Sequence, residues 1–334
     1  MALLEARGVS VVYAPKRGTR IWSVRDVDLS LEEGEFVGIV GESGCGKSTL
    51  GFALTRMLRP PAHLEGGTIS FAGADIAKLG GEQLRRQRRH GFALVLQSGM
   101  NALNPVRNVA QQFGDVLRAH TLAAESWDKR AVRERGEVLL GLVELEASVL
   151  NRYPHELSGG MRQRVAIALA LALEPRFIVF DEPTTALDVI VQAAIMATIK
   201  SLQQTQGFTG VLISHDMGVV LDATDRTLVM YGGRIVEDQS RADLVRGEHH
   251  PYSEALLRCY ADPRAERVEL EDIPGSPPDL SLDLPGCSFA PRCDVAQEVC
   301  WTELPGLGPL GGGRAACHVR APLPSALEGA GSAS

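Results

Sequence analysis

Short apolar runs alternate with helical patterns over roughly the first 250 residues, which predicts an α/β fold. In contrast, Leu3–Tyr13 and Asp26–Leu31 alternate apolar and polar positions more regularly, which predicts a half-exposed antiparallel sheet. Other runs are continuously apolar, as is typical of parallel strands buried on both faces. These runs are Glu35–Val40, Phe177–Phe180, Gly210–Ser214 and Thr227–Tyr231.

The pattern changes twice further along the chain. From about Val109 to Leu150, Ala, Leu, Glu and Arg recur at helical spacing without strand signals, so we expect a helical insertion. Beyond about Pro251 the chain is rich in Pro and Gly and cannot build a large core of its own. We therefore predict a main domain over residues 1–250, with a helical subdomain at about 98–170, an extension over 251–322 and a disordered tail over 323–334.

Composition narrows the class of protein. A net charge of −7 excludes a globally cationic surface of the kind that drives non-specific binding to nucleic acid. The basic run Arg85–His90 is therefore interpreted as a solvated helical face, and no nucleic-acid partner is expected. The N-terminal stretch carries no secretion-signal pattern. The longest apolar run, Val165–Leu173, has about half the length of a bilayer span.

A glycine-rich loop follows the first continuously apolar run and precedes an amphipathic stretch. This context and the pattern G-x-x-x-x-G-K-[ST] predict a phosphate-binding loop whose backbone N–H groups form an anion site. Lys47 would contact the terminal phosphates, the Ser48 hydroxyl would ligate Mg²⁺, and Cys45 is assigned no redox role. The loop consists of Gly41, Glu42, Ser43, Gly44, Cys45, Gly46, Lys47, Ser48 and Thr49.

An acidic pair stands at the end of another apolar run. Asp181 directly follows Phe177–Phe180, where a carboxylate can hold the Mg²⁺ shell that phosphoryl transfer requires. The adjacent Glu182 can polarise the attacking water as a general base. Alone this pair would be weak evidence, but the upstream phosphate loop makes a nucleotide-hydrolysing site the best interpretation.

Two longer stretches carry a family resemblance. Asp181-Glu-Pro-Thr-Thr-Ala-Leu-Asp188 lies shortly after Leu157-Ser-Gly-Gly-Met-Arg-Gln163, and the second stretch resembles the signature motif of ABC transporter ATPases. With the phosphate loop, the motifs cover roughly residues 1–240 and resemble the nucleotide-binding subunit of an ABC transporter. The implied fold is α/β: a P-loop ABC ATPase core with an antiparallel β subdomain and a helical subdomain, plus a small Cys-rich C-terminal extension.

The resemblance also implies roles for individual residues, with ATP as substrate and Mg²⁺ as cofactor. Tyr13 corresponds to the aromatic residue that stacks on adenine, although another group covering the adenine stays an alternative. Ser158, Gly159 and Gly160 would act on the ATP of a partner subunit in a head-to-tail dimer. Gln97 corresponds to the Q-loop glutamine and would organise Mg²⁺ together with Ser48 and Asp181. Asp188 corresponds to the D-loop aspartate, and His215 to the histidine that senses the γ-phosphate.

Several stretches are similar to the oligopeptide and dipeptide importers of this family: Tyr153–Arg164, Leu103–Val106, His250–Tyr252 and Pro274–Asp279. They imply the first (D-type) of two different ATPase subunits, peripheral on the cytoplasmic face of the cell membrane. The implied partners are the second ATPase subunit, two transmembrane permease subunits and, indirectly, an extracellular solute-binding protein. Peptides are the default cargo, with nickel chelates or oligosaccharides as alternatives. A soluble ABC ATPase without a transport role is the rival in another class.

Four cysteines crowd the C-terminal end of the chain. Four thiolates in a short Pro/Gly-rich segment could hold an iron–sulfur cluster or Zn²⁺, or remain free thiols or reversible disulfides. Their spacing lacks the tight pairs of common zinc ribbons, and the family resemblance favours a [4Fe–4S] cluster because related importer ATPases carry one. The proposed ligands are Cys287, Cys293, Cys300 and Cys317.

Overall fold

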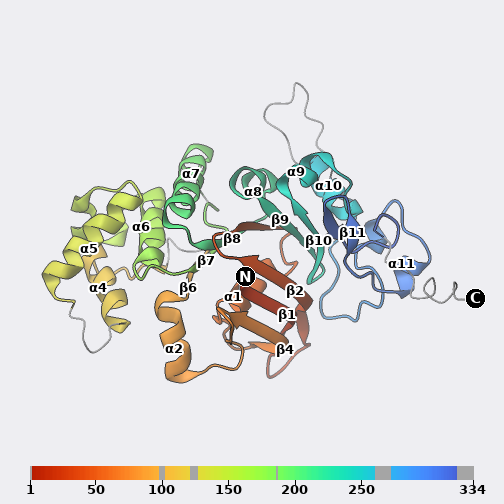
Figure 1. Ribbon diagram of the computed structural model, residues 1–334, viewed down its shortest axis with the longest axis horizontal. Helices are drawn as coiled ribbons and strands as arrows, with labels where there is room; N and C mark the ends of the chain where they lie inside the picture. Colours follow the sequence, from red (N-terminus) through yellow and green to blue (C-terminus); the bar gives the residue numbers. More distant parts are fainter. Residues whose placement is uncertain (1, 98–101, 121–126, 186, 260–271, 322–334) are drawn as a thin grey trace, which may run out of the picture.

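The fold is that of a computed structural model, which describes residues 2–97, 102–120, 127–185, 187–259 and 272–321. Its larger sheet has the strand order β11-β12-β10-β9-β3-β8-β7-β6 (Figure 1). The strands from β9 to β6 run parallel, whereas β10, β12 and β11 are antiparallel additions at one edge. The parallel strands are β3 (Phe36–Val40), β6 (Phe92–Val95), β7 (Phe177–Asp181), β8 (Thr209–Ser214) and β9 (Arg226–Tyr231).

Both faces of the parallel strands are buried, which explains why their sequences are continuously apolar. On one face, Ile39 and Val179 pack in a core shared with helix α1 (Lys47–Leu54) and the antiparallel sheet. On the other face, Val40 and Phe180 pack in a second core with α7 (Val189–Gln206) and α8 (Met217–Ala223). The carboxyl ends of β3, β7 and β8 therefore lie at one edge of the sheet, where the predicted site residues follow.

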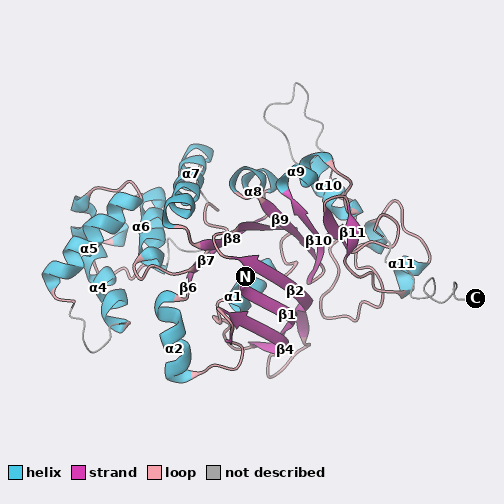
Figure 2. Ribbon diagram, viewed as in Figure 1, coloured by secondary structure: helices cyan, strands magenta, loops and turns pink. Residues whose placement is uncertain are grey.

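The smaller sheet is antiparallel and has the order β2-β1-β4-β5 (Figure 2). Its first two strands are β1 (Ala2–Tyr13) and β2 (Ile21–Glu32), so the antiparallel sheet predicted from their alternation is confirmed. The two other strands of this sheet were not predicted, β4 (Ala62–Phe71) and β5 (Ala74–Asp75). The glycine pair inside β4 interrupts the alternation that would mark it as a strand.

The predicted helical insertion is a group of helices at one end of the molecule (Figure 1). The basic run Arg85–His90 lies in a separate helix, α2 (Gly81–His90), beside β6. The helices of the insertion are α4 (Val109–Ala119), α5 (Lys129–Leu142), the short η1 (Ala147–Asn151) and η2 (Pro154–Glu156), and α6 (Gly159–Leu171).

The described residues beyond 240 lie at the opposite end of the larger sheet (Figure 2). They contribute β12, which pairs with β10 (Arg234–Ser240), and β11, which pairs with β12, so this segment and the main sheet are continuous. Its elements are α9 (Arg241–Arg246), α10 (Pro251–Cys259), η3 (Ala290–Arg292), α11 (Val299–Thr302), β11 (Gly308–Leu310) and β12 (Gly313–Ala315).

None of the described helices combines the length and the apolar character that crossing a bilayer requires. The α/β fold with a separate antiparallel sheet is confirmed. The limits near residues 98, 170, 250 and 322 stay predictions. The tail over 323–334 lies outside the described residues.

Candidate functional site

The phosphate loop joins β3 to α1 in a conformation that depends on glycine at two positions. Gly41 has φ +153°, and a Cβ there would lie 2.2 Å from the Met230 carbonyl oxygen. Gly46 has φ +109°, and its Cβ would lie 2.1 Å from the Ser23 carbonyl oxygen. The loop is therefore in close contact with two neighbouring strands, and residue types other than glycine would displace it.

The loop lysine is buried and folds back onto its own loop. Lys47 Nζ donates hydrogen bonds to the Gly41 carbonyl at 2.6 Å and to the Glu42 carbonyl at 2.9 Å. Cys45 is buried beside it, and burial raises the pKa of the Cys45 thiol. That Cys45 has no redox role stays a prediction.

Hydroxyl groups connect the loop to two other predicted residues. Ser48 Oγ donates to Asp181 Oδ1 at 2.7 Å, which joins the start of α1 to the last residue of β7. The Thr49 and Tyr13 hydroxyls share a hydrogen bond of 3.2 Å. The structure thus brings Tyr13, at the end of β1, next to the phosphate loop.

The Ser48–Asp181 pair offers hydroxyl and carboxylate oxygens, the donor set that Mg²⁺ prefers. Asp181 is buried, and this burial raises the pKa of its carboxyl above the ordinary range, while the Ser48 hydrogen bond opposes the increase. A divalent cation would offset the desolvation of the carboxylate, so the residues present fit Mg²⁺.

Three predicted residues meet at the ends of β6, β7 and β8. Glu182 Oε2 accepts hydrogen bonds from Gln97 Nε2 at 3.0 Å and from Thr185 Oγ1 at 2.9 Å. His215 Nδ1 lies 3.3 Å from Glu182 Oε1. Glu182 has φ +44°, a conformation that is uncommon for residues other than glycine and that clusters at functional sites. This arrangement could orient and deprotonate a water molecule.

The Ser158–Gly160 motif and Asp188 lie together at the starts of two helices. Ser158 caps α6 by accepting from the Met161 N–H at 3.3 Å, and Asp188 caps α7 by accepting from the Val191 N–H at 3.0 Å. A Cβ on Gly160 would lie 2.7 Å from a methyl carbon of Val191, so the two helix starts are adjacent. Among the hydrogen bonds of the described residues, none joins Ser158, Gly159 or Gly160 to the phosphate loop.

The four C-terminal cysteines converge on one cavity of about 10 Å³. Backbone N–H groups point at their sulfurs: the Gln297 N–H lies 3.5 Å from Cys300 Sγ and the Arg320 N–H lies 3.4 Å from Cys317 Sγ. Burial raises the pKa of Cys287 to about 11 and also raises that of Cys293.

This cavity does not have the form of a finished metal site. Within the part of the chain that the structure describes, no group of three or more His, Cys, Asp or Glu side chains is arranged to hold a metal ion. A volume of about 10 Å³ accepts one water-sized particle and not a four-iron cluster. The predicted [4Fe–4S] cluster and its zinc alternative therefore have matching donor types, but the thiols would have to move to bind either.

The sequence analysis missed two residues that contact the phosphate loop from the C-terminal extension. Arg292 binds the Glu42 carboxylate, and the Tyr252 hydroxyl accepts from the Glu42 N–H at 2.8 Å. The only signals were indirect: Arg292 stands immediately before a cysteine, and Tyr252 belongs to the His-Pro-Tyr stretch, which carries a resemblance to the importers but implies no contact with the loop.

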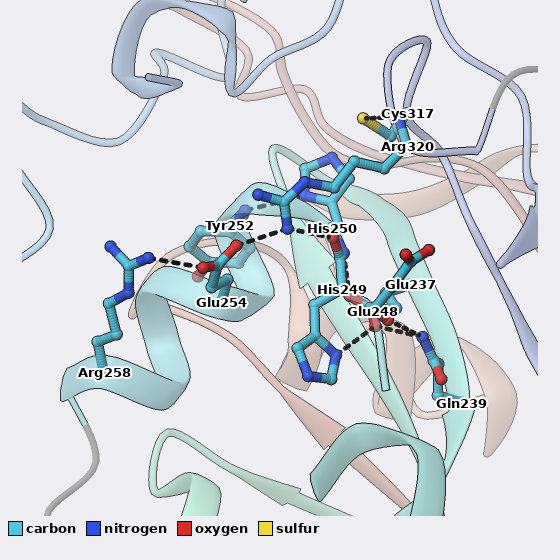
Figure 3. A network of polar contacts seen from close by, with 10 residues as sticks. All are labelled: Glu237, Gln239, Glu248, His249, His250, Tyr252, Glu254, Arg258, Cys317 and Arg320. Atoms are coloured by element: carbon cyan, nitrogen blue, oxygen red, sulfur yellow. Dashed lines mark hydrogen bonds and ion pairs between the residues drawn. The ribbon is translucent and has the colours of Figure 1, made fainter. Parts of the chain in front are cut away.

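A polar network holds the last described segment against β10 and α10 (Figure 3). Arg320 Nη1 donates to the His249 carbonyl at 3.0 Å and to Glu254 Oε2 at 2.5 Å. At the base of the network, the fully buried carboxylate of Glu237 accepts from the His250 N–H at 2.9 Å and from Gln239 Nε2 at 2.8 Å. The segment that carries Cys317 is thus attached independently of Arg292.

Comparison with protein families agrees with this geometry. Residues 24–185 match the family described as ABC transporter, and residues 236–300 match the family described as oligopeptide/dipeptide transporter, C-terminal region. The second match contains three of the four clustered cysteines.

Similar proteins span almost the whole chain. A probable peptide ABC transporter ATP-binding protein of Sinorhizobium fredii is 40% identical over 94% of this chain and 93% of its own length. A dipeptide transport ATP-binding protein of Bacillus subtilis is 38% identical over 91% of this chain and 90% of its own length. Among solved structures, a dimeric ATP-binding cassette bound to ADP and phosphate superimposes with a TM-score of 0.63 at 29% identity, covering 71% of this chain and 98% of that one.

Proposed function

This chain belongs to the ATP-binding proteins of peptide ABC transporters, and on that premise we propose that it hydrolyses ATP to power peptide uptake through a membrane importer. The observation that carries the proposal is the meeting of Gln97, Glu182 and His215 next to the Ser48–Asp181 pair. These residues come from four separate segments, and an arrangement of this kind suits hydrolysis of a bound nucleotide.

The proposed chemistry assigns each residue one task. Lys47 leaves the Gly41 and Glu42 carbonyls to neutralise the terminal phosphates, and Tyr13 stacks on the adenine. Ser48, Asp181 and Gln97 would hold Mg²⁺, which when bound supplies charge neutralisation at the phosphates. Glu182 takes the proton from the attacking water, while His215 stabilises the γ-phosphate.

The Ser158–Gly160 motif supports a proposal of dimerisation. Its N–H groups stand at a helix start, which is a phosphate-binding device, yet it makes no hydrogen bond to the phosphate loop among the described residues. We propose that it closes on the ATP of a second ATPase subunit, with Asp188 at the same contact. The second subunit is proposed to be a different chain, since this one resembles the first member of a pair.

The importer supplies the remaining partners. The chain is proposed to lie peripherally on the cytoplasmic face of the membrane, bound to two permease subunits that a solute-binding protein supplies with cargo. An apolar groove of about 530 Å³, lined by residues that include Leu94, Leu103 and Ala166, runs between the core and the helical insertion. It is the proposed seat of a permease segment, through which dimer closure would be transmitted.

Glu182→Gln tests the hydrolytic assignment. The amide keeps an oxygen for Gln97 and Thr185 but cannot take a proton, so ATP binding should persist while phosphate release falls about a hundredfold or more. Titration calorimetry measures the first quantity and a phosphate-release assay on the assembled complex measures the second. Glu174→Gln, at an exposed surface ion pair with Arg135, is the matched control and should leave both unchanged. Wild-type turnover in Glu182→Gln would refute the assignment.

We also propose that Cys287, Cys293, Cys300 and Cys317 form one ligand set, for a [4Fe–4S] cluster first and Zn²⁺ second. Their convergence on one cavity and the N–H groups at the sulfurs support it. Protein purified without oxygen should be brown, absorb near about 400 nm and lose the colour in Cys293→Ser, whereas Cys259→Ser should keep it. Colourless protein that contains zinc would select the alternative, and colourless protein without metal would refute both.

A further inference from the structure

Glu42, the second residue of the phosphate loop, is bound on all sides. Its N–H donates to the Tyr252 hydroxyl at 2.8 Å, and its carbonyl accepts from Lys47 Nζ at 2.9 Å. Its carboxylate accepts from both terminal nitrogens of Arg292, at 2.7 and 3.0 Å. One residue thus links the lysine of the loop to two residues of the C-terminal extension.

Arg292 is built into its site with every donor in use. Besides the two bonds to Glu42, Nη1 donates to the Tyr231 hydroxyl at 3.1 Å, Nη2 to the Ile273 carbonyl at 3.1 Å and Nε to the Pro274 carbonyl at 2.7 Å. These bonds occupy all five N–H groups of a guanidinium. The side chain is only 3% exposed, so this fork cannot reorient without losing several bonds.

We infer that Arg292 is a positioning residue for ATP, which holds the phosphate loop in its binding conformation by way of Glu42. The inference rests on the proposed function only in requiring that the loop binds ATP. Two physical effects follow from the contact. The loop needs less ordering when the nucleotide arrives, and the Glu42 carboxylate is neutralised before a triphosphate approaches it.

Contacts other than that of Arg292 also hold the extension to the main domain. Arg314 Nη2 lies 2.7 Å from Asp238 Oδ2, where β12 pairs with β10, and Arg320 binds Glu254 in the network of Figure 3. Replacing Arg292 should therefore alter the phosphate loop without releasing the segment. Arg314 offers a matched control, because it is also an arginine of the extension paired with a carboxylate of the main sheet.

The test compares Mg-ATP binding by the full chain, by calorimetry, with hydrolysis by the assembled complex. In Arg292→Gln the Kd and KM for ATP should rise about tenfold, which corresponds to about 1.4 kcal/mol, while kcat at saturating ATP changes less than about twofold. Arg292→Lys keeps the charge but loses the two-pronged contact of the guanidinium with the carboxylate, so the Kd and KM for ATP should rise about threefold. This second variant also serves if Arg292→Gln does not fold.

Two further variants distinguish positioning of the phosphate loop by Arg292 from a general loosening of the C-terminal extension. Arg314→Gln should bind ATP within about twofold of wild type. In a Glu42→Gln background, Arg292→Gln should change the Kd by less than about threefold, since the carboxylate it neutralises is absent.

Unchanged ATP affinity in both Arg292 variants, an equal effect of Arg314→Gln, or a fall in kcat without a rise in KM would each overturn the inference. Wild-type protein that does not bind ATP would overturn the proposed function, and this inference with it.

Discussion

At the scale of single residues, the phosphate loop is shaped by the carbonyl groups that surround it. Gly46 lies against the Ser23 carbonyl, so any side chain there meets a backbone atom that cannot give way. Gly44 also has a positive φ, of +82°, but a Cβ there would meet nothing within 4 Å. Gly46 is therefore required by both its backbone conformation and the lack of space, whereas Gly44 is required by its backbone conformation alone.

Gly46→Ala should destabilise the fold and abolish ATP binding, because the new Cβ would lie 2.1 Å from the Ser23 oxygen. We expect a loss of about 2 kcal/mol or more in the free energy of unfolding, measured by urea titration. Gly44→Ala is the matched control and should cost only about 1 kcal/mol, from its backbone conformation alone. Equal losses in the two variants would contradict the steric argument.

Residues that share a local motif could be predicted, and residues joined only by the fold could not. Ser48 belongs to the phosphate-loop motif and Asp181 directly follows the apolar run Phe177–Phe180, so each is predicted as a Mg²⁺ residue from its own local motif. The two side chains lie 2.7 Å apart. Arg292 is separated from Glu42 by most of the chain, and its segment has no periodic pattern. Nothing local indicates which surface such a segment covers.

At the scale of elements, β10 shows why one strand of the larger sheet escaped prediction. Its sequence carries Glu237, Asp238 and Gln239 in succession, which looks like a solvated loop. All three are buried, and their partners come from elsewhere: the Asp238 carboxylate binds both Arg226 and Arg314, and the Glu237 carboxylate receives the His250 N–H. The polar side chains of such a buried strand find their hydrogen-bond partners in distant parts of the chain, and a hydrophobic pattern carries no information about those partners.

His250, immediately before α10, should make the free energy of unfolding depend on pH. Burial lowers the pKa of this histidine to about 4, whereas the unfolded chain takes up the proton near 6.5. Between these values the unfolded state binds more protons, so stability should fall as pH decreases from 6.5 towards 4. We expect a loss of about 2 kcal/mol between pH 7 and pH 5, measured by urea titration at both pH values.

His250→Asn provides the comparison. The His250 ring accepts from the Tyr252 N–H at 3.0 Å, and an Asn side chain can accept from the same N–H two residues on without titrating. The variant should therefore lose less stability than wild type over this pH interval. If His250→Asn lost as much stability between pH 7 and pH 5 as the wild type, the pH dependence would arise from other groups.

At the scale of the whole molecule, the nucleotide site and the cysteine cavity are neighbours within one structure. The segment between Cys287 and Cys293 carries Phe289, which packs edge-on against Tyr231 at 5.3 Å, and Arg292, which reaches the phosphate loop. A change at the cysteines therefore has a short physical route to the ATP site. The helical insertion, with the apolar groove beside it, lies at the other end of the larger sheet (Figure 1).

The pairing of β12 with β10 has a consequence for how the protein is made. Translation releases β9 and β10 well before Arg314 and Ala315, so the nascent chain carries an open sheet edge while the intervening residues are synthesised. Such an edge is a template for pairing with other chains. The ribosome-bound intermediate thus exposes the β10 edge from the synthesis of β10 until that of β12, and products of termination between these two strands would keep the edge exposed.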